Sequence, residues 1–128
     1  MRKVLSMLLI MVFCLTSLAM AKSVTLIWTA PADDKGLPTE GPVTSYLLGY
    51  SNSTITEANF ATATRLVTGT PKAINATETY TYDLPDGRVY FFAVKSVDKA
   101  GNISPLSNVP TLDFFLPTNI TDLRVSTP

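Results

Sequence analysis

Residues 23–31 read SVTLIWTAP, and this stretch decides the fold. Its apolar side chains recur at every second position, as Val24, Leu26 and Trp28, and Pro31 closes it. Alternation with a period of two, rich in β-branched residues and ended by proline, is typical of a β-strand with one buried face. We therefore expect a strand here that turns Val24, Leu26 and Trp28 toward a core.

The same alternation recurs along the chain. Further strands are predicted over residues 46–50, 65–67, 80–84, 89–97 and 108–112. Residues 33–42 read DDKGLPTEGP, which is turn chemistry throughout and predicts a loop. Residues 55–63 are ambiguous, because a single helical turn over residues 56–60 suits them as well as an irregular segment does. No stretch has a convincing helical period.

Short strands separated by regular turn signals favour an all-β fold, a β-sandwich of two sheets. Its expected core consists of inward-facing strand positions: Leu26, Trp28, Tyr46, Leu48, Leu84, Tyr90, Phe92 and Val94.

The chain begins with the pattern of a signal peptide. Arg2 and Lys3 form a basic start, an apolar run follows, and Ala19 and Ala21 place small side chains at positions −3 and −1 of a signal peptidase site. We expect residues 1–21 to be removed on export, which leaves a secreted, periplasmic or cell-surface protein with no membrane attachment. An uncleaved anchor is the alternative, although the apolar run is near the shortest that spans a bilayer.

Removal of the leader changes the composition. All four Met residues and the single Cys, Cys14, lie within it, so residues 22–128 contain no Met, Cys or His. No disulfide can form, and the fold depends on apolar burial and backbone pairing. Residues 22–128 carry eight Lys and Arg against ten Asp and Glu, scattered along the chain. Without a basic patch, we expect neither nucleic acid nor anionic membrane as a partner.

In combination, these segments resemble a fibronectin type III domain. The matching pieces are VTLIWTAP at residues 24–31 as strand B, SYLLGY at 45–50 as strand C, YFFAV at 90–94 as strand F, and DKAGNIS at 98–104 as the following turn. The resemblance implies a Greek-key sandwich over residues 22–113. It also makes Tyr90 the tyrosine-corner residue, whose hydroxyl bonds to the backbone near Leu84.

Two departures from that family pattern concern its first strand. Strand A is missing, because the predicted cleavage site adjoins strand B. Residues 114–128 form a linker and a tail that resembles the strand A of a following repeat, as in exported bacterial tandem-repeat proteins. An unpaired strand B is a template for another chain. Residues 117–128 of a neighbouring molecule could fill it and give strand-swapped self-association; a frayed tail on a fragment of a repeat array is the alternative.

Catalysis is not expected, and no cofactor is implied. A chain without His or Cys lacks the commonest general bases and thiol nucleophiles. The Asp and Glu residues fall mainly in turns, where short polar side chains are favoured for backbone reasons. No phosphate-binding loop and no metal motif built on His or Cys is present.

A calcium site is a sharper alternative. In the resembled fold, residues 33–42 and 98–104 share one pole, which would bring oxygen ligands together as Ca²⁺ requires. The candidate ligands are Asp33, Asp34, Glu40, Asp98 and Asn102. Their spacing matches no calcium motif, and solvated turn residues are the simpler interpretation.

These features favour an exported spacer or protein-interaction module of adhesive or cell-envelope type, with an unidentified protein or cell-surface partner. One alternative is a carbohydrate- or calcium-binding accessory domain. The other is a truncated fragment of a tandem-repeat protein with no independent function. The predicted loops lack the aromatic residues that binding hot spots usually contain.

Overall fold

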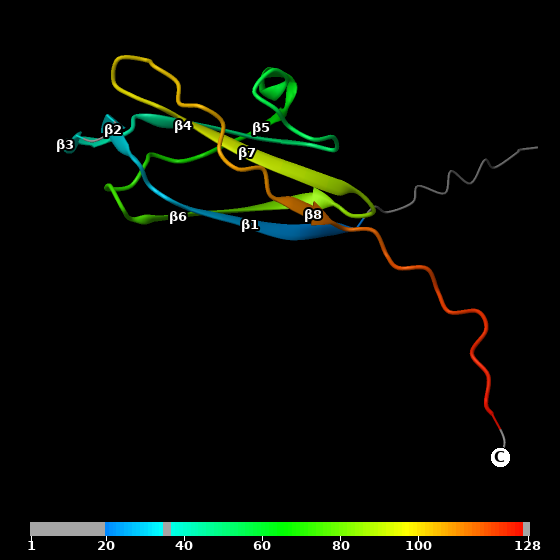
Figure 1. Cartoon of the computed structure of the whole chain (residues 1–128). Coiled ribbons are helices and arrows are strands. Elements are labelled where there is room, and N and C mark those ends of the chain that lie inside the picture. The colour runs from blue at the N-terminus through cyan, green and yellow to red at the C-terminus, as the bar shows by residue number, and fades with distance from the viewer. Residues whose placement is uncertain (1–19, 35–36, 127–128) are drawn as a thin grey trace, which may run out of the picture.

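The computed structural model describes residues 20–34 and 37–126. These residues form an all-β structure whose antiparallel sheets pack face to face as in a β-sandwich, which confirms the predicted fold class at this level (Figure 1). One sheet pairs β1 with β6, a second pairs β2 with β3, and a four-stranded sheet has the order β5-β4-β7-β8. The strands are β1 (Ala21–Thr29), β2 (Ala32–Asp34), β3 (Leu37–Pro42), β4 (Ser45–Ser51), β5 (Thr64–Leu66), β6 (Thr77–Pro85), β7 (Val89–Val97) and β8 (Thr111–Asp113).

The two main sheets enclose a core built largely from alternating strand positions. In β1, Val24 is buried, whereas its neighbours Ser23 and Thr25 are exposed, as the period of two predicts. Tyr90 and Phe92 of β7 face this side from the opposite sheet. Aromatic rings fill much of the interior, with the Tyr50 and Tyr90 centroids 5.5 Å apart. The central cluster comprises Val24, Leu84, Tyr90, Phe92 and Phe114, with Leu26, Tyr50 and Leu112 packed against it.

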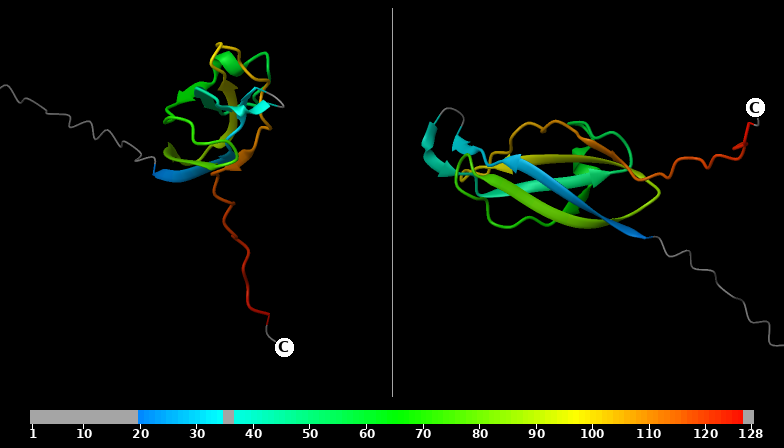
Figure 2. Two further views of the ribbon diagram at one scale, coloured as in Figure 1. Left: turned by 90° about the vertical axis from the view of Figure 1, so that its left-hand side faces the viewer. Right: turned by 90° about the horizontal axis from the view of Figure 1, so that it is seen from below.

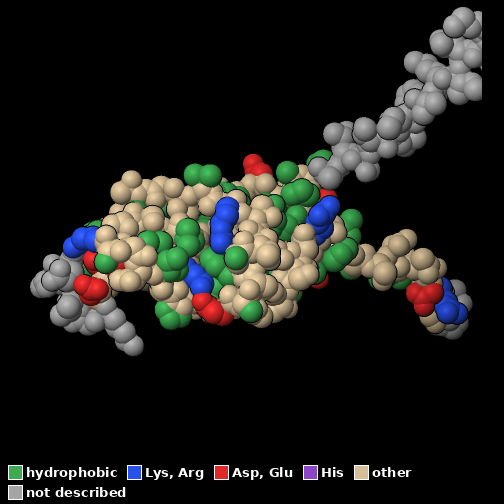
Figure 3. Space-filling model, turned by 90° about the horizontal axis from the view of Figure 1, so that it is seen from above, with side chains coloured by type: hydrophobic (Ala, Val, Ile, Leu, Met, Phe, Trp, Pro, Cys, Tyr) green, Lys and Arg blue, Asp and Glu red, His purple; other side chains and the backbone are tan. Residues whose placement is uncertain are grey.

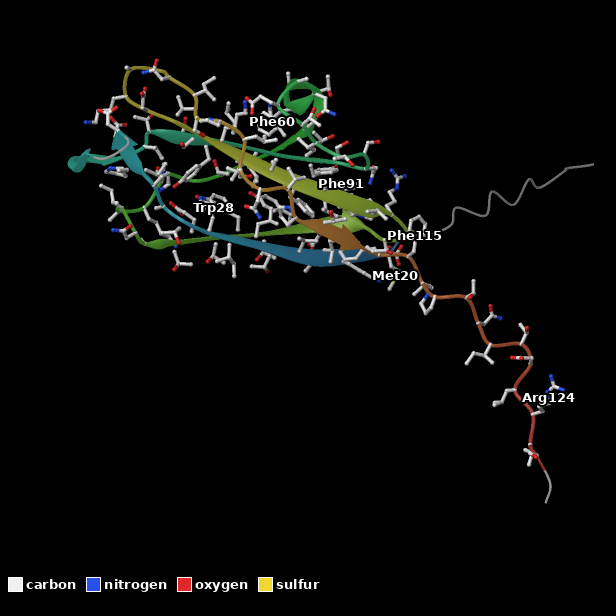
Figure 4. The ribbon with its side chains drawn as sticks, viewed as in Figure 1. Met20, Trp28, Phe60, Phe91, Phe115 and Arg124 are labelled. Carbon is white, nitrogen blue, oxygen red and sulfur yellow. The ribbon has the colours of Figure 1, made fainter. Side chains whose placement is uncertain are left out.

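A second apolar cluster covers the other face of the four-stranded sheet. Residues 55–63 pass over this face and include a 3₁₀ helix, Phe60–Thr62 (Figure 4). Phe60 packs with Ala93 of β7, while Phe91 lies alongside them. Because both faces of the sheet are covered, β7 reads as the almost unbroken apolar run VYFFAV, which is typical of a strand buried on two sides. The ambiguous residues 55–63 therefore form a short helical turn, slightly later than expected.

Two predicted segments differ in the structure. Residues 33–42 were expected to be a loop, but they lie within the β2–β3 hairpin, in which Ala32 pairs with Pro42. The last strand was expected over residues 108–112, but β8 covers only Thr111–Asp113. Pro110 has no N–H to donate to a ladder, although its carbonyl accepts a bond of 3.0 Å from the Phe92 N–H.

Both ends of the sandwich chain meet at the β6–β7 turn. The Met20 carbonyl accepts a hydrogen bond of 2.9 Å from the Asp86 N–H, and the Phe114 carbonyl accepts one of 3.1 Å from the Gly87 N–H. Met20 and the tail that follows Phe114 therefore lie at the same end of the sandwich (Figure 2). Phe114 belongs to the core, so the packing extends one residue beyond the boundary expected at residue 113.

The predicted leader lies outside the described residues, apart from Met20 and Ala21, and so does its site residue Ala19. Ala21 is the first residue of β1, where it pairs with Pro85. The described residues include no helical segment with the length and hydrophobicity of a transmembrane span.

Candidate functional site

The outer edge of β1 has no strand partner among the described residues. Ala30 donates to the Ala76 carbonyl at 2.8 Å, and Met20 accepts from Asp86, so the even-numbered positions of this register form the hydrogen-bonded pairs with β6. Alternation then directs the N–H and C=O groups of the odd-numbered residues away from β6. These residues are Ser23, Thr25, Ile27 and Thr29.

Two adjoining hollows run beside this open edge, between the sheets. The first, of about 280 Å³, lies along residues 25–28 of β1 and faces residues 107–110 across the gap. The second, of about 210 Å³, lies nearer Thr29 and Pro31. Trp28, Val94 and Ser107 line both hollows. The open edge and the two hollows together are called the β1 slot below.

The β1 slot explains why three predicted core residues are only half-buried. The side chains of Leu26, Trp28 and Val94 point toward the interior, as the sequence predicts, but each of them lines a hollow and stays partly exposed. The remaining predicted core residues are buried, namely Tyr46, Leu48, Leu84, Tyr90 and Phe92. The partial exposure of the first three follows from the missing neighbour of β1, which the alternation pattern of β1 itself does not reveal.

A buried polar cluster supports the floor of the β1 slot. The Trp28 ring stacks on Tyr80 with centroids 5.2 Å apart and meets Tyr46 edge-on at 5.1 Å. Glu78 beside them is fully buried, and its Oε1 accepts hydrogen bonds from the Lys72 N–H at 2.6 Å and from the Tyr46 hydroxyl at 3.3 Å. Glu78 Oε2 and the Trp28 indole nitrogen have no hydrogen-bond partner within the part of the chain that the structure describes.

Burial also controls the tyrosines of this cluster. It raises the pKa of Tyr46 to about 12, since the phenolate would lose its hydration and would face Glu78; the Trp28 indole opposes part of this shift. Burial is also the main reason why the pKa of Tyr80 is raised. Sequence reasoning did not single out Glu78, but the signal was present, because Glu78 shares the phase of Tyr80, Tyr82 and Leu84 in β6.

The structure brings part of the predicted calcium set to one pole. An open hollow of about 540 Å³ is lined by Asp33, Asp34, Asp98 and Asn102, among others. Asp33 Oδ1 accepts a bond of 3.0 Å from the Lys99 N–H, and Asp33 Oδ2 lies 3.7 Å from Lys99 Nζ. The pole therefore uses Asp33 to fasten the β2–β3 hairpin to the turn at residues 98–102.

Asp98 is engaged within its own turn. Its Oδ1 accepts from the Asn102 N–H at 2.8 Å and its Oδ2 from Asn102 Nδ2 at 2.7 Å. These hydrogen bonds hold the pKa of Asp98 below its usual value. The side chain of Glu40 lies outside the described part of the structure. Within the described residues, no three acidic, His or Cys side chains gather as metal ligands would.

Charge does not mark any other site on the face that Figure 3 shows, where Lys and Arg side chains are dispersed among polar ones. The Lys95–Glu57 ion pair ties β7 to residues 55–63, beside the second apolar cluster. Arg65 lies over the Phe60 ring at 4.2 Å. The cationic side chains named here thus support the fold, and the β1 slot is the most distinctive feature of the described surface.

Comparison of the chain with protein-family models, with curated proteins and with solved structures finds no match.

Proposed function

We propose that this chain is an exported, non-catalytic protein-interaction module that takes up an extended peptide segment in the β1 slot. The observation that carries the proposal is the open edge of β1, which offers four residues' worth of backbone donors and acceptors beside two apolar hollows. Addition of a strand to such an edge gives affinity through main-chain bonds and specificity through pockets for alternate side chains. Each new bond contributes a net ~1 kcal/mol.

We also propose that the fold is a Greek-key sandwich of the fibronectin type III kind, without its first strand. Support comes from the order of the sheets, one holding β1 and β6 and the other β5, β4, β7 and β8. The Tyr90 hydroxyl donates to the Pro85 carbonyl at 2.7 Å, next to the residue that the tyrosine-corner pattern indicates. In this interpretation β1 is strand B, and the slot is the place of the missing strand A.

A non-catalytic role suits the side chains that the processed chain would carry. Residues 22–128 contain no His and no Cys; at the pole, Asp33 accepts a hydrogen bond from Lys99 of the facing turn, and Asp98 accepts one from Asn102 of its own turn. Export follows from the leader pattern, and N-terminal sequencing of the protein recovered outside the cytoplasm tests it. We expect the sequence to begin at Lys22; a start at Met1 would contradict cleavage.

Peptide selection tests the binding role. Residues 117–126 are exposed, and no hydrogen bond from another described residue holds them, so removing them leaves the sandwich contacts intact. A random peptide library displayed on phage is panned against residues 22–116, which lack the tail. We expect the bound peptides to alternate apolar and polar residues and to avoid central proline.

A pair of proline variants makes the selection specific to the edge. Ile27→Pro removes an N–H that points away from β6, whereas Thr79→Pro removes the equivalent group on the outer edge of β6, since Ile27 and Thr79 are register partners. Binding of the selected peptides should fall at least tenfold in the Ile27 variant and stay unchanged in the Thr79 variant. Equal losses in both variants, or no selected peptides at all, would refute the proposal.

A further inference from the structure

The tail of the chain has the pattern of a strand but no partner strand among residues 20–34 and 37–126. Residues 117–126 are exposed throughout and extend away from the sandwich (Figure 1). Leu123 and Val125 are 90% and 92% exposed, the most exposed large apolar side chains of the described residues. They are two positions apart and alternate with polar Asp122, Arg124 and Ser126, so in an extended strand both would lie on one face.

The β1 slot and the tail are complementary in spacing and chemistry. The slot has two adjoining hollows that share Trp28, and the tail has two apolar side chains on one face at the spacing of one strand repeat. The slot has unpaired backbone groups along Thr25, Ile27 and Thr29, and the tail has free backbone groups along its length. Each would satisfy what the other leaves exposed.

The direction of the tail decides between its own slot and that of another molecule. The tail leaves at the end where β1 begins, because Phe114 and Met20 bond to the same turn. To enter its own slot it must reverse within a few residues and then run parallel to β1. A tail that continues forward meets the Thr29 end of a following molecule and runs antiparallel to β1, which is the more stable pairing per residue.

We infer that the occupant of the β1 slot is the tail of a second copy of this chain, donated head to tail. Leu123 then fills the hollow nearer Thr29, and Val125 fills the one beside Leu26. This arrangement places Arg124 opposite Ile27, with both side chains on the outer face. Each molecule donates its tail to the next molecule and accepts the tail of the one before it. Such a head-to-tail contact does not close into a symmetric dimer, so it builds linear oligomers that lengthen with concentration. The inference rests on the proposed function of the slot.

Light scattering over a range of concentrations tests the association. For residues 22–128 we expect a mass that rises with concentration, and for residues 22–116 a constant monomer mass. Val125→Asp should weaken association at least tenfold, because it places a charge in a hollow. Ser126→Asp, on the opposite face of the tail, is the matched control and should associate as the unaltered chain does. A monomer at all concentrations would overturn the inference.

Cross-linking tests the direction of pairing. Residues 22–128 contain no Cys, so the double variant Ile27→Cys with Arg124→Cys carries two defined thiols. A short bis-maleimide should give a ladder of covalent multimers, whereas Ala61→Cys with Arg124→Cys should give only background, because Ala61 is exposed in the 3₁₀ helix on the far face of the four-stranded sheet. An internally linked monomer would show the tail in its own slot. A product that stops at the dimer would show symmetric exchange, and either result would overturn head-to-tail donation.

The two proposals fail in different ways. If selected peptides bind residues 22–116 through the edge of β1 but residues 22–128 stay monomeric, the slot is a binding site and the tail is not its occupant. If neither peptides nor tail bind there, the proposed function itself is wrong.

Discussion

The cluster around Tyr46 shows how much a single buried side chain depends on its surroundings. Its ring lies edge-on to Trp28, and its hydroxyl donates to Glu78 deep between the sheets. A phenolate at this position would be stripped of water and would face a carboxyl group. The neutral form of Tyr46 is therefore part of what holds the two sheets together.

We expect thermal stability to fall as the pH rises above 10. The folded-state pKa of Tyr46 is raised from 10.0 to about 12, so the stability it contributes is fully present below pH 10 and is lost as the pH rises toward 12. The melting temperature of Tyr46→Phe should fall less steeply with pH across this range. Part of the fall should remain, because the pKa values of Tyr80, Tyr82 and Tyr90 are also raised. Melting curves from pH 8 to 12 measure both slopes; identical slopes would contradict this role.

At the scale of elements, period-two alternation predicted β1, β4, β6 and β7 well, because each turns alternate side chains toward the sandwich interior, although β7 is covered on its other face as well. It could not predict the β2–β3 hairpin, since residues 33–42 have turn chemistry and no alternation. The contact of Asp33 with Lys99 joins segments far apart in sequence, which local patterns do not encode. The β1 slot was visible in part, through the missing strand, whereas its hollows depend on where residues 107–110 pass.

The pole that joins the β2–β3 hairpin to residues 98–102 should not respond to calcium. The Asp33 and Asp98 carboxylates already accept hydrogen bonds from Lys99 and Asn102, which a cation would have to displace. A site with a Kd of ~10 µM would, at ~1 mM calcium, stabilise the fold by about 2.7 kcal/mol, which is several degrees in a domain of this size. We expect residues 22–128 to melt at the same temperature with calcium or with EDTA; a rise with calcium would restore the metal hypothesis.

At the scale of the whole molecule, Phe114 marks where the packed structure ends and the tail begins. Its ring lies 5.7 Å from that of Tyr90, and Lys22 Nζ sits 5.1 Å from its centroid. Phe115 next to it is 62% exposed (Figure 4). Two adjacent phenylalanines thus differ completely, since Phe114 is anchored in the core and Phe115 lies in solvent. The sequence FF alone does not show this difference.

Substitution of the two phenylalanines should separate these roles. Phe114→Ala leaves a cavity in the central cluster and should lower the free energy of unfolding by about 3–5 kcal/mol. Phe115→Ala is the matched control and should change it by less than about 0.5 kcal/mol. Chemical denaturation of both variants measures the difference. Similar losses would mean that the core extends into the tail.

The start of β1 and Phe114 lie together at the β6–β7 turn, since Lys22 pairs with Leu84 and the Phe114 carbonyl accepts a hydrogen bond from Gly87, and this has a mechanical consequence. A force that pulls the start of β1 and Phe114 of one molecule apart acts at one end of the sandwich. It therefore breaks the hydrogen-bonded pairs of the β1–β6 ladder one after another. The lone molecule is therefore weak under tension. A donated strand that enters at the Thr29 end would move the point of loading to the far end of β1. The force would then act along the paired strands, so that their hydrogen bonds share the load in shear and have to break together.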